Sequence, residues 1–225
     1  MKQNVIAIDG PAGAGKSTVA RGVAQQLGFT YVDTGAMYRA VTSRTLDMGL
    51  DPTDAEAIGA MAARIDVRFA REGETLRVLA DGQDVTEQIR TPAVTAAVAQ
   101  VSQIPAVRQA MVRLQRELAA AGKAVLDGRD IGTVVTPDAC CKIFLTASAQ
   151  ERARRRWLEL CAKGYEPDPN QLRRDMEERD KQDSERELAP LVQAPDAIAI
   201  DTTGLTIEAV VGRIAAIYQD RMRRE

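Results

Sequence analysis

The sequence predicts an α/β fold, in which a parallel sheet is flanked by helices. Short apolar runs alternate with longer segments of helical periodicity along most of the 225 residues. A glycine-rich loop connects the first apolar run to the first helical segment, a position at which α/β proteins bind anions. One stretch, residues 67–89, has the pattern of antiparallel strands and interrupts the alternation.

The first elements alternate regularly. Residues 5–8 are an apolar run rich in β-branched side chains, typical of a buried strand, and residues 16–27 have helical periodicity ended by Gly28. Residues 29–32 predict a second strand and residues 36–50 a second helix.

Residues 67–89 carry strand patterns with no helix between them. Two apolar runs flank the turn sequence Arg-Glu-Gly-Glu at 71–74, and a second turn falls at Asp81-Gly82. We interpret this stretch as a small antiparallel insertion. An edge hairpin on the main sheet is the alternative.

The second half returns to alternating strands and helices. The expected helices span residues 92–102, 105–122, about 150–163, 170–188 and 206–222, and the expected strands span residues 124–126, 142–145 and 197–200.

The loop after the first strand has the spacing G-x-x-x-x-G-K-S, so the expected fold is a parallel sheet of the P-loop type. Its glycines allow successive backbone N–H groups to surround phosphate oxygens. Lys16 can reach the β- and γ-phosphates of a nucleotide, and the Ser17 hydroxyl can ligate Mg²⁺. A glycine-rich turn that binds nothing is the alternative, but the order of strand, loop, lysine, serine and helix favours phosphate binding.

Composition narrows the possible functions. The chain contains no histidine, which excludes His-based acid–base catalysis and His-ligated metal sites. Phosphoryl transfer is compatible with this, because it relies on positioning and charge neutralisation. A net charge of -2 and the lack of a long apolar run argue against nucleic-acid and membrane partners. Cys140, Cys141 and Cys161 lack metal or disulfide spacing, so we expect reduced thiols in the cytoplasm.

Arginines follow several of the expected strands. Arg39 and Arg129 lie just beyond strand ends, and Arg179 and Arg186 lie on a highly charged helix. A single arginine is commonly a surface residue, but several at one sheet edge favour a second phosphate beside the first. This indicates a two-substrate transferase rather than a hydrolase.

These features together resemble the bacterial cytidylate kinase family of nucleoside monophosphate kinases. The matching stretches run in family order along the chain: residues 8–18, 33–39, 89–91, 105–108, 127–135, 137–139, 142–145 and 178–180. The P-loop occurs in many families, whereas residues 33–39, 105–108 and 127–135 together are specific to this one.

The resemblance implies transfer of the γ-phosphoryl group of ATP to CMP or dCMP. The residues expected to bind ATP are Gly10, Pro11, Ala12, Gly13, Ala14, Gly15, Lys16, Ser17 and Thr18, with Mg²⁺ at Ser17 and with Arg155 and Arg156 on a short lid at about 148–166. The residues expected around the phosphate of CMP are Thr34, Tyr38, Arg39 and Arg129. Those expected on its base and ribose are Arg108, Asp130, Arg179 and Asp183, with Arg186 alongside. Lys16, Arg129, Arg179 and Arg186 are the expected catalytic residues.

The resemblance also implies how the chain is divided. Residues 1–62 and 101–225 match a kinase core, and residues 63–100 match an insertion that binds the nucleoside monophosphate. Ala99 stands where the family commonly has a serine that contacts the base. We expect a monomer.

Two other functions remain open at this point. A kinase for another small acceptor is the nearest; UMP differs from CMP at one base edge, whereas the insertion and the Arg108/Asp130 pair argue against shikimate. A nucleotide-dependent switch of the GTPase kind is the second, although no N-K-x-D motif follows a strand.

Overall fold

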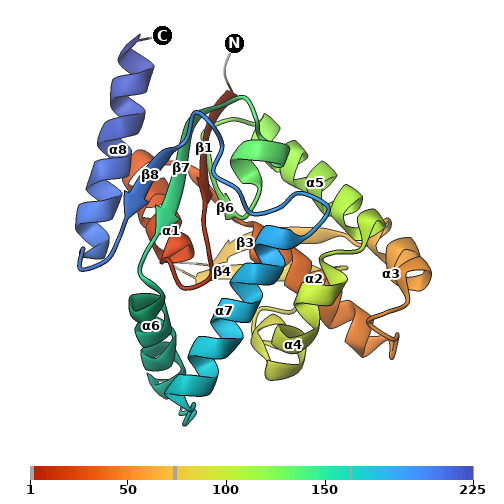
Figure 1. Ribbon diagram of the computed structural model, residues 1–225. Helices are drawn as coiled ribbons and strands as arrows, with labels where there is room; N and C mark the ends of the chain where they lie inside the picture. Colours follow the sequence, from red (N-terminus) through yellow and green to blue (C-terminus); the bar gives the residue numbers. More distant parts are fainter. Residues whose placement is uncertain (1–2, 73–74, 163, 225) are drawn as a thin grey trace. The chain divides into compact units, whose positions relative to one another are not determined.

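The computed structural model describes residues 3–72, 75–162 and 164–224 (Figure 1). The chain forms two compact units, one of residues up to Tyr31 and from Ala119 onward, the other Val32–Leu118. The expected insertion, residues 63–100, lies within the second unit. The expected limits of core and insertion remain a prediction.

The first unit is built on a parallel sheet, which confirms the expected fold class. The strands of this sheet are β1 (Gln3–Asp9), β2 (Thr30–Asp33), β6 (Ala124–Gly128), β7 (Ala139–Thr146) and β8 (Ile198–Asp201), and the division between the units falls within β2. In the described residues they take the order β2-β6-β1-β7-β8, with β1 parallel to both β6 and β7, and β8 parallel to β7. The side chains of residues 5–8 in the central strand are fully buried, as their apolar, β-branched sequence predicts.

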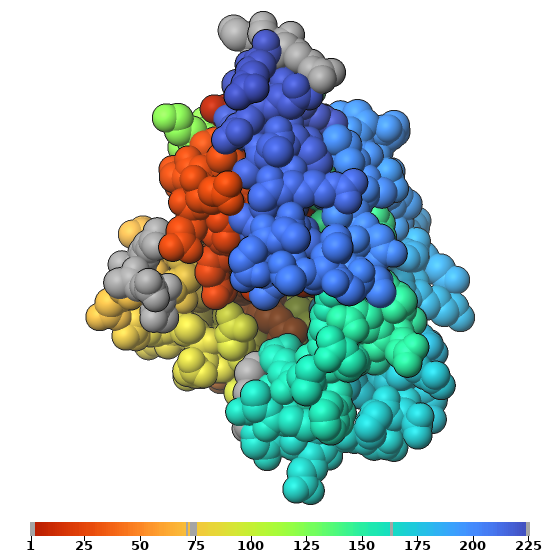
Figure 2. Space-filling model, turned by 90° about the vertical axis from the view of Figure 1, so that its left-hand side faces the viewer, coloured from red at the N-terminus to blue at the C-terminus, as the bar shows by residue number. Residues whose placement is uncertain are grey.

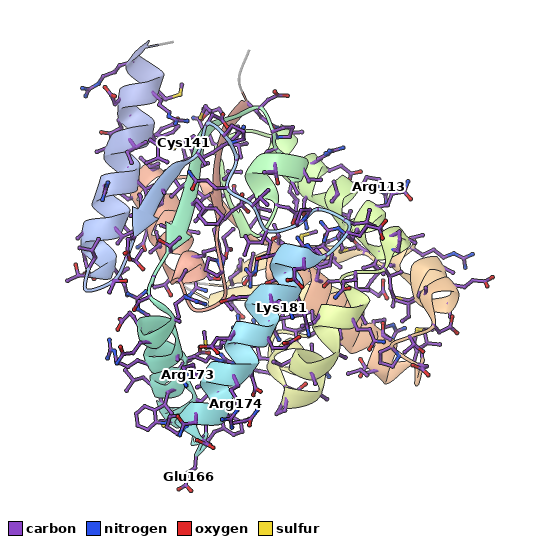
Figure 3. The ribbon with its side chains drawn as sticks, viewed as in Figure 1. Arg113, Cys141, Glu166, Arg173, Arg174 and Lys181 are labelled. Atoms are coloured by element: carbon purple, nitrogen blue, oxygen red, sulfur yellow. The ribbon has the colours of Figure 1, made fainter. Side chains whose placement is uncertain are left out.

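The α-helices described in this unit are α1 (Lys16–Leu27), α6 (Ala149–Ala162), α7 (Pro169–Glu185) and α8 (Ile207–Arg224). α1 and α8 pack against each other, and Figure 2 shows α8 in blue beside α1 in red-orange. They approach closely, since a Cβ placed at Gly22 would meet Val211 Cγ2 at 2.8 Å. α6 and α7 form a second packed pair, and the segment between them carries Glu166 (Figure 3).

The second unit has a small antiparallel sheet of its own. Its strands are β3 (Val67–Glu72), β4 (Thr75–Ala80) and β5 (Gln83–Asp84), with Val67 paired to Ala80. The expected antiparallel insertion is therefore confirmed, and the alternative of a hairpin on the edge of the main sheet is wrong. The turn residues 73 and 74 lie outside the described residues.

Helices form the rest of the second unit. They are α2 (Thr34–Asp47), α3 (Ala55–Ala62), the single turn η1 (Gln88–Arg90), α4 (Pro92–Val101) and α5 (Pro105–Ala120). α2 packs on α4 and β4, and the core of the unit includes the fully buried side chains of Met37, Ile58, Val101 and Met111. α2 begins two residues before the expected start, because the Asp33 side chain accepts a hydrogen bond from the Ala36 N–H.

The turn η1 was not predicted, and neither were two further elements. α3 has only eight residues, and its start is fixed by Asp54, whose side chain accepts a hydrogen bond from the Ala57 N–H at 3.0 Å. The other is η2, a π-helical turn over Ile131–Val135 that follows β6. In the described part of the chain, no helix has an apolar stretch long enough to span a bilayer.

Two glycines without close neighbours test how backbone conformation decides the effect of an added Cβ on stability. Gly28 caps α1 at φ 67°, a conformation that penalises a Cβ, whereas Gly212 lies within α8 without a positive φ. We expect Gly28→Ala to lower the free energy of unfolding by about 1 kcal/mol and Gly212→Ala to raise it by about 0.5 kcal/mol. Urea denaturation measures both. Equal shifts in the same direction would contradict the left-handed cap at Gly28.

Candidate active site

The P-loop lies between β1 and α1, and its glycines are required for its path. Gly13 and Gly15 have φ of 75° and 86°, which side chains disfavour. A Cβ at Gly10 would collide with the backbone carbonyl oxygen of Leu145 on β7. The loop is therefore held close to the edge of the sheet.

Lys16 lies at the first turn of α1 and is buried, with 7% of its surface exposed. Its Nζ donates a hydrogen bond to the Pro11 carbonyl oxygen at 2.7 Å. Burial, followed by the positive charge of Arg129, holds the pKa of Lys16 well below its usual value, while Asp127 opposes this shift. Arg179 also lowers this pKa. The P-loop lysine thus shares one electrostatic environment with two of the expected catalytic arginines.

Ser17 contacts a carboxylate that sequence analysis did not assign a role. The Ser17 Oγ donates a hydrogen bond to Asp127 Oδ2 at 2.8 Å, and the Tyr31 hydroxyl donates to Asp127 Oδ1 at 2.9 Å. The register between β1 and β6 pairs Ile8 with Asp127, so this carboxylate lies at the sheet edge where the P-loop begins. Among the described residues there is no cluster of three or more His, Cys, Asp or Glu that would hold a metal by itself.

Four expected substrate residues form one network of charges. Arg129 Nε donates to Asp183 Oδ2 at 2.7 Å, and Arg186 Nη2 lies 3.2 Å from Asp130 Oδ1. Arg186 Nη1 is also 3.9 Å from Asp183 Oδ1. Burial by itself raises the pKa of Asp183, but the charges of Arg129, Arg179 and Arg186 outweigh it and lower that pKa below the usual value. The structure therefore brings Arg129 at the end of β6 close to Arg186 at the end of helix α7, where their positive charges suit phosphate binding.

The other expected CMP residues lie in the second unit and form their own contacts. The Arg108 guanidinium lies over the Tyr38 ring, 5.7 Å from its centroid. Arg39 Nη1 donates to the Ile89 carbonyl oxygen at 3.2 Å and to Thr95 Oγ1 at 2.9 Å. Thr34, at the start of α2, is 2% exposed.

The two lid arginines differ in their contacts. Arg155 donates hydrogen bonds to the Oγ1 and carbonyl oxygen of Thr202, whose own hydroxyl donates to the P-loop carbonyl oxygen of Ala14. Arg156 instead forms an ion pair with Glu159 on its own helix. Their assignment to ATP remains a prediction.

A neighbouring arginine contacts the P-loop directly but was not singled out. Arg152 Nη1 donates to the Ala12 carbonyl oxygen at 3.1 Å and forms an ion pair with Asp180, which accepts a hydrogen bond from the Ala12 N–H. The basic helix that carries Arg152 was evident in the sequence. Which of its arginines faces the loop depends on the packing of α6, which the sequence does not give.

Asp9 is a second carboxylate that sequence analysis left without a role. It ends β1, and its two oxygens accept hydrogen bonds from the Ile131 and Gly132 N–H groups, both at 2.8 Å. Burial raises the pKa of Asp9 to about 6, although the two backbone N–H groups stabilise its charged form. Asp9 thereby ties the strand before the P-loop to the turn after Arg129 and Asp130.

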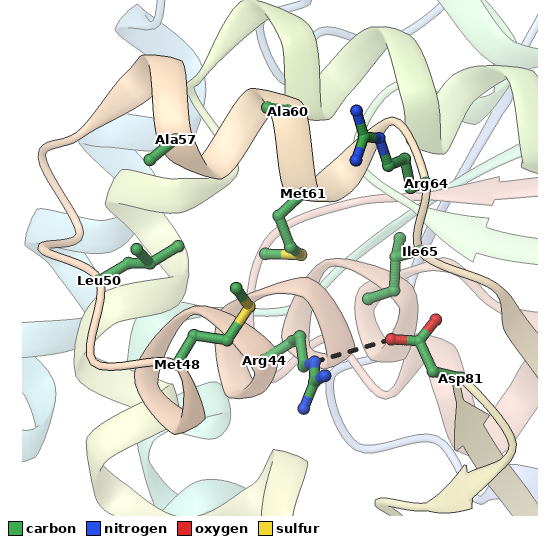
Figure 4. A pocket seen from close by; sticks show the side chains of 9 residues that line it. All are labelled: Arg44, Met48, Leu50, Ala57, Ala60, Met61, Arg64, Ile65 and Asp81. Atoms are coloured by element: carbon green, nitrogen blue, oxygen red, sulfur yellow. Dashed lines mark ion pairs between the residues drawn. The ribbon is translucent and has the colours of Figure 1, made fainter.

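The second unit also contains a pocket of about 400 Å³ that none of the expected site residues lines (Figure 4). Met48, Leu50 and Met61 form its apolar walls, and Arg44 forms an ion pair with Asp81 at 3.6 Å on its border. This pocket is separate from the expected nucleotide-binding residues of the same unit.

Strand β1 of the parallel sheet leads into a P-loop, and a largely buried network of arginines and carboxylates lies beside it. These features define a P-loop protein with a site suited to several phosphate groups. The chain belongs to the cytidylate kinase family, whose model, described as "Cytidylate kinase", matches residues 6–220. This confirms the family resemblance of the sequence.

Individual relatives agree with this assignment. The chain is 52% identical to a cytidylate kinase of Desulfitobacterium hafniense, over 99% of this chain and 96% of that one. It is 54% identical to a cytidylate kinase of Carboxydothermus hydrogenoformans, over 94% of this chain and 96% of that one. A crystal structure of an uncharacterized protein from Eubacterium ventriosum has the same fold, with a TM-score of 0.53 at 13% identity over 97% of this chain and 99% of that one.

The buried carboxylate of Asp9 gives a pH-dependent prediction. Because its pKa is raised in the fold, the protonated form is favoured there, and this contribution to stability is lost as the pH rises from about 4 through about 6. The difference from the usual value of 3.8 corresponds to about 3 kcal/mol. We expect the unfolding free energy of the unchanged protein to fall by up to this amount relative to Asp9→Asn over that interval. Urea denaturation at a series of pH values measures it, and a constant difference would contradict the raised pKa.

Proposed function

We propose that this protein transfers the γ-phosphoryl group of ATP to CMP or dCMP, giving CDP or dCDP. The observation that supports this most directly is the shared electrostatic environment of Lys16, Arg129 and Arg179 beside the P-loop. Similarity of about 50% to cytidylate kinases over almost the whole chain supports the same acceptor.

ATP would be held by the P-loop. Residues 10–18 would surround its phosphates, with the backbone N–H groups of residues 13–18 and the N-terminus of α1 as donors and Lys16 on the β- and γ-phosphates. We propose that Arg155 and Arg156 add positive charge from α6. The donor set of Ser17 and Asp127 suits Mg²⁺, which takes hard oxygen ligands from one or two protein groups and from phosphates. Mg²⁺ bound there would neutralise negative charge on the phosphate oxygens.

CMP would be bound by the residues that the family resemblance assigns to its phosphate, base and ribose. We propose that Thr34, Tyr38, Arg39 and Arg129 hold its phosphate. Arg108 and Asp130 would read the cytosine edge, while Arg179, Asp183 and Arg186 would lie at the ribose and at the transferred group. Arginine suits these roles because its planar guanidinium donates two parallel hydrogen bonds to one phosphate.

The reaction would need no protein base. The attacking atom is a phosphate oxygen of CMP, which is largely ionised at neutral pH, so the absence of histidine is no obstacle. The work of the protein would be to align donor and acceptor and to neutralise their repulsion, through Lys16 and the arginines. We further propose that the protein works as a monomer in the cytoplasm, with its three cysteines as free thiols.

ADP release from ATP and Mg²⁺, with a panel of acceptors, tests this function. The panel contains CMP, dCMP, UMP, dTMP, AMP, GMP and shikimate. We expect CMP and dCMP to give the highest kcat/KM, with UMP weaker, despite Ala99 at the position where the family commonly has serine. Equal use of UMP would contradict base reading by Arg108 and Asp130. A lack of stimulation by every acceptor would favour a nucleotide-dependent switch instead.

Lys16 provides the matching test by mutation. We expect Lys16→Ala to lower kcat about a hundredfold or more, because a charge that stabilises the transition state is removed. Lys181, an exposed lysine on α7 (Figure 3), provides the control, and Lys181→Ala should retain kcat. Steady-state kinetics at saturating ATP and CMP measure both, with a thermal melt to verify folding. Near-normal kcat in Lys16→Ala would exclude the proposed role.

A further inference from the structure

The backbone N–H and carbonyl groups of Ala12 in the P-loop both form hydrogen bonds with one ion pair, whose two members lie on different helices. Arg152 on α6 donates from Nη1 to the Ala12 carbonyl oxygen at 3.1 Å. Asp180 on α7 accepts a hydrogen bond on Oδ1 from the Ala12 N–H at 3.3 Å, and its other oxygen pairs with Arg152. We call these three residues the Ala12 clasp.

The clasp is sheltered from water and its arginine is fixed at a second point. The side chains of Arg152 and Asp180 are 11% and 19% exposed. Arg152 Nε also donates to the carbonyl oxygen of Ala147, just before α6. An ion pair that is both shielded from solvent and anchored by further hydrogen bonds holds its geometry better than an exposed one.

The helices also touch the loop next to the clasp. A Cβ at Gly13 would lie 2.8 Å from Met176 Cε on α7 and 3.0 Å from the Cβ of Arg152. Met176 lies one helical turn before Asp180, so the same face of α7 contacts both residues of the loop. The contact between α7 and the P-loop is therefore continuous over about one turn.

Helix α7 carries the arginines that the reaction would use. Arg179 precedes Asp180 directly, and Asp183 and Arg186 follow within two turns on the same helix or at its end. Asp183 and Arg186 contact Arg129 and Asp130 at the end of β6. Fixing Asp180 to Ala12 thus fixes the position of these groups along the P-loop.

We propose that Arg152 and Asp180 are positioning residues for phosphoryl transfer, which set the register of α7 and its arginines against the P-loop through Ala12. This rests on the proposed kinase function. Since in-line transfer is sensitive to displacements of about 1 Å, loss of the clasp lowers kcat more than it weakens ATP binding.

The test compares Asp180→Asn, Arg152→Ala and the double variant with Glu177→Gln. Glu177 lies on the same helix and forms an exposed ion pair with Arg173, 3.8 Å apart, so its variant is the matched control (Figure 3 labels Arg173). We expect each clasp variant to lose about tenfold to a hundredfold in kcat, with the ATP dissociation constant changed less than about threefold. Isothermal titration calorimetry measures the ATP dissociation constant.

The double variant shows whether Arg152 and Asp180 act as one unit or independently of each other. If Arg152 and Asp180 act together through Ala12, the double variant is no slower than the slower single variant. Additive losses overturn the proposal, and so does full kcat in the single variants. A loss confined to ATP affinity also overturns it, since the two residues then bind nucleotide rather than position α7.

Hydrogen exchange keeps the test independent of turnover. Without the clasp, the backbone amides of residue 10 and of residues 12–15 exchange faster than in the unchanged protein, and those of Glu177→Gln do not. Unchanged exchange in Asp180→Asn overturns the clasp. If the unchanged protein phosphorylates none of the acceptors, the proposed function fails, and the exchange result still decides whether Ala12 is held in this way.

Discussion

The first unit depends on keeping several positive charges close together and largely out of water. Lys16 is buried, and the charges of Arg129 and Arg179 add to the cost of its ammonium group, which is why its pKa is lowered. The negative charges of Asp127 and Asp183, which contact Ser17 and Arg129, reduce this cost. Asp127 and Asp183 therefore stabilise the positive charges of the site, independently of any catalytic role.

The parallel sheet brings these charges together. The register of β1 with β6 pairs Asp9 with Gly128, so the P-loop and the segment that carries Arg129 leave the sheet at the same edge. Asp9 then binds the backbone of the turn that follows Asp130. Two segments more than a hundred residues apart in the sequence thus form one rigid base for the site.

Much of this arrangement was predictable from local sequence. The P-loop, its flanking strand and helix, and Gly28 at the helix end each have a signature of fixed spacing, and the structure contains all of them. α3 was not predicted, because a helix of eight residues, half of them Ala, has little periodicity to detect. The parts of the site that escaped prediction are contacts between distant segments. Neither the pairing of Arg152 with Asp180 nor the hydrogen bonds of Asp9 have any local pattern that would indicate them.

The two units differ in how their residues are distributed along the chain, and this has a consequence for biosynthesis. The second unit is continuous, Val32–Leu118, whereas the first combines residues up to Tyr31 with those from Ala119 onward. Of the described strands, β1 leaves the ribosome before the others, and both of its neighbours, β6 and β7, come more than a hundred residues later. At bacterial elongation rates this delay is on the order of ten seconds. During that time the apolar strand that precedes the P-loop has no partner strand, and the whole second unit is synthesised before β6 appears.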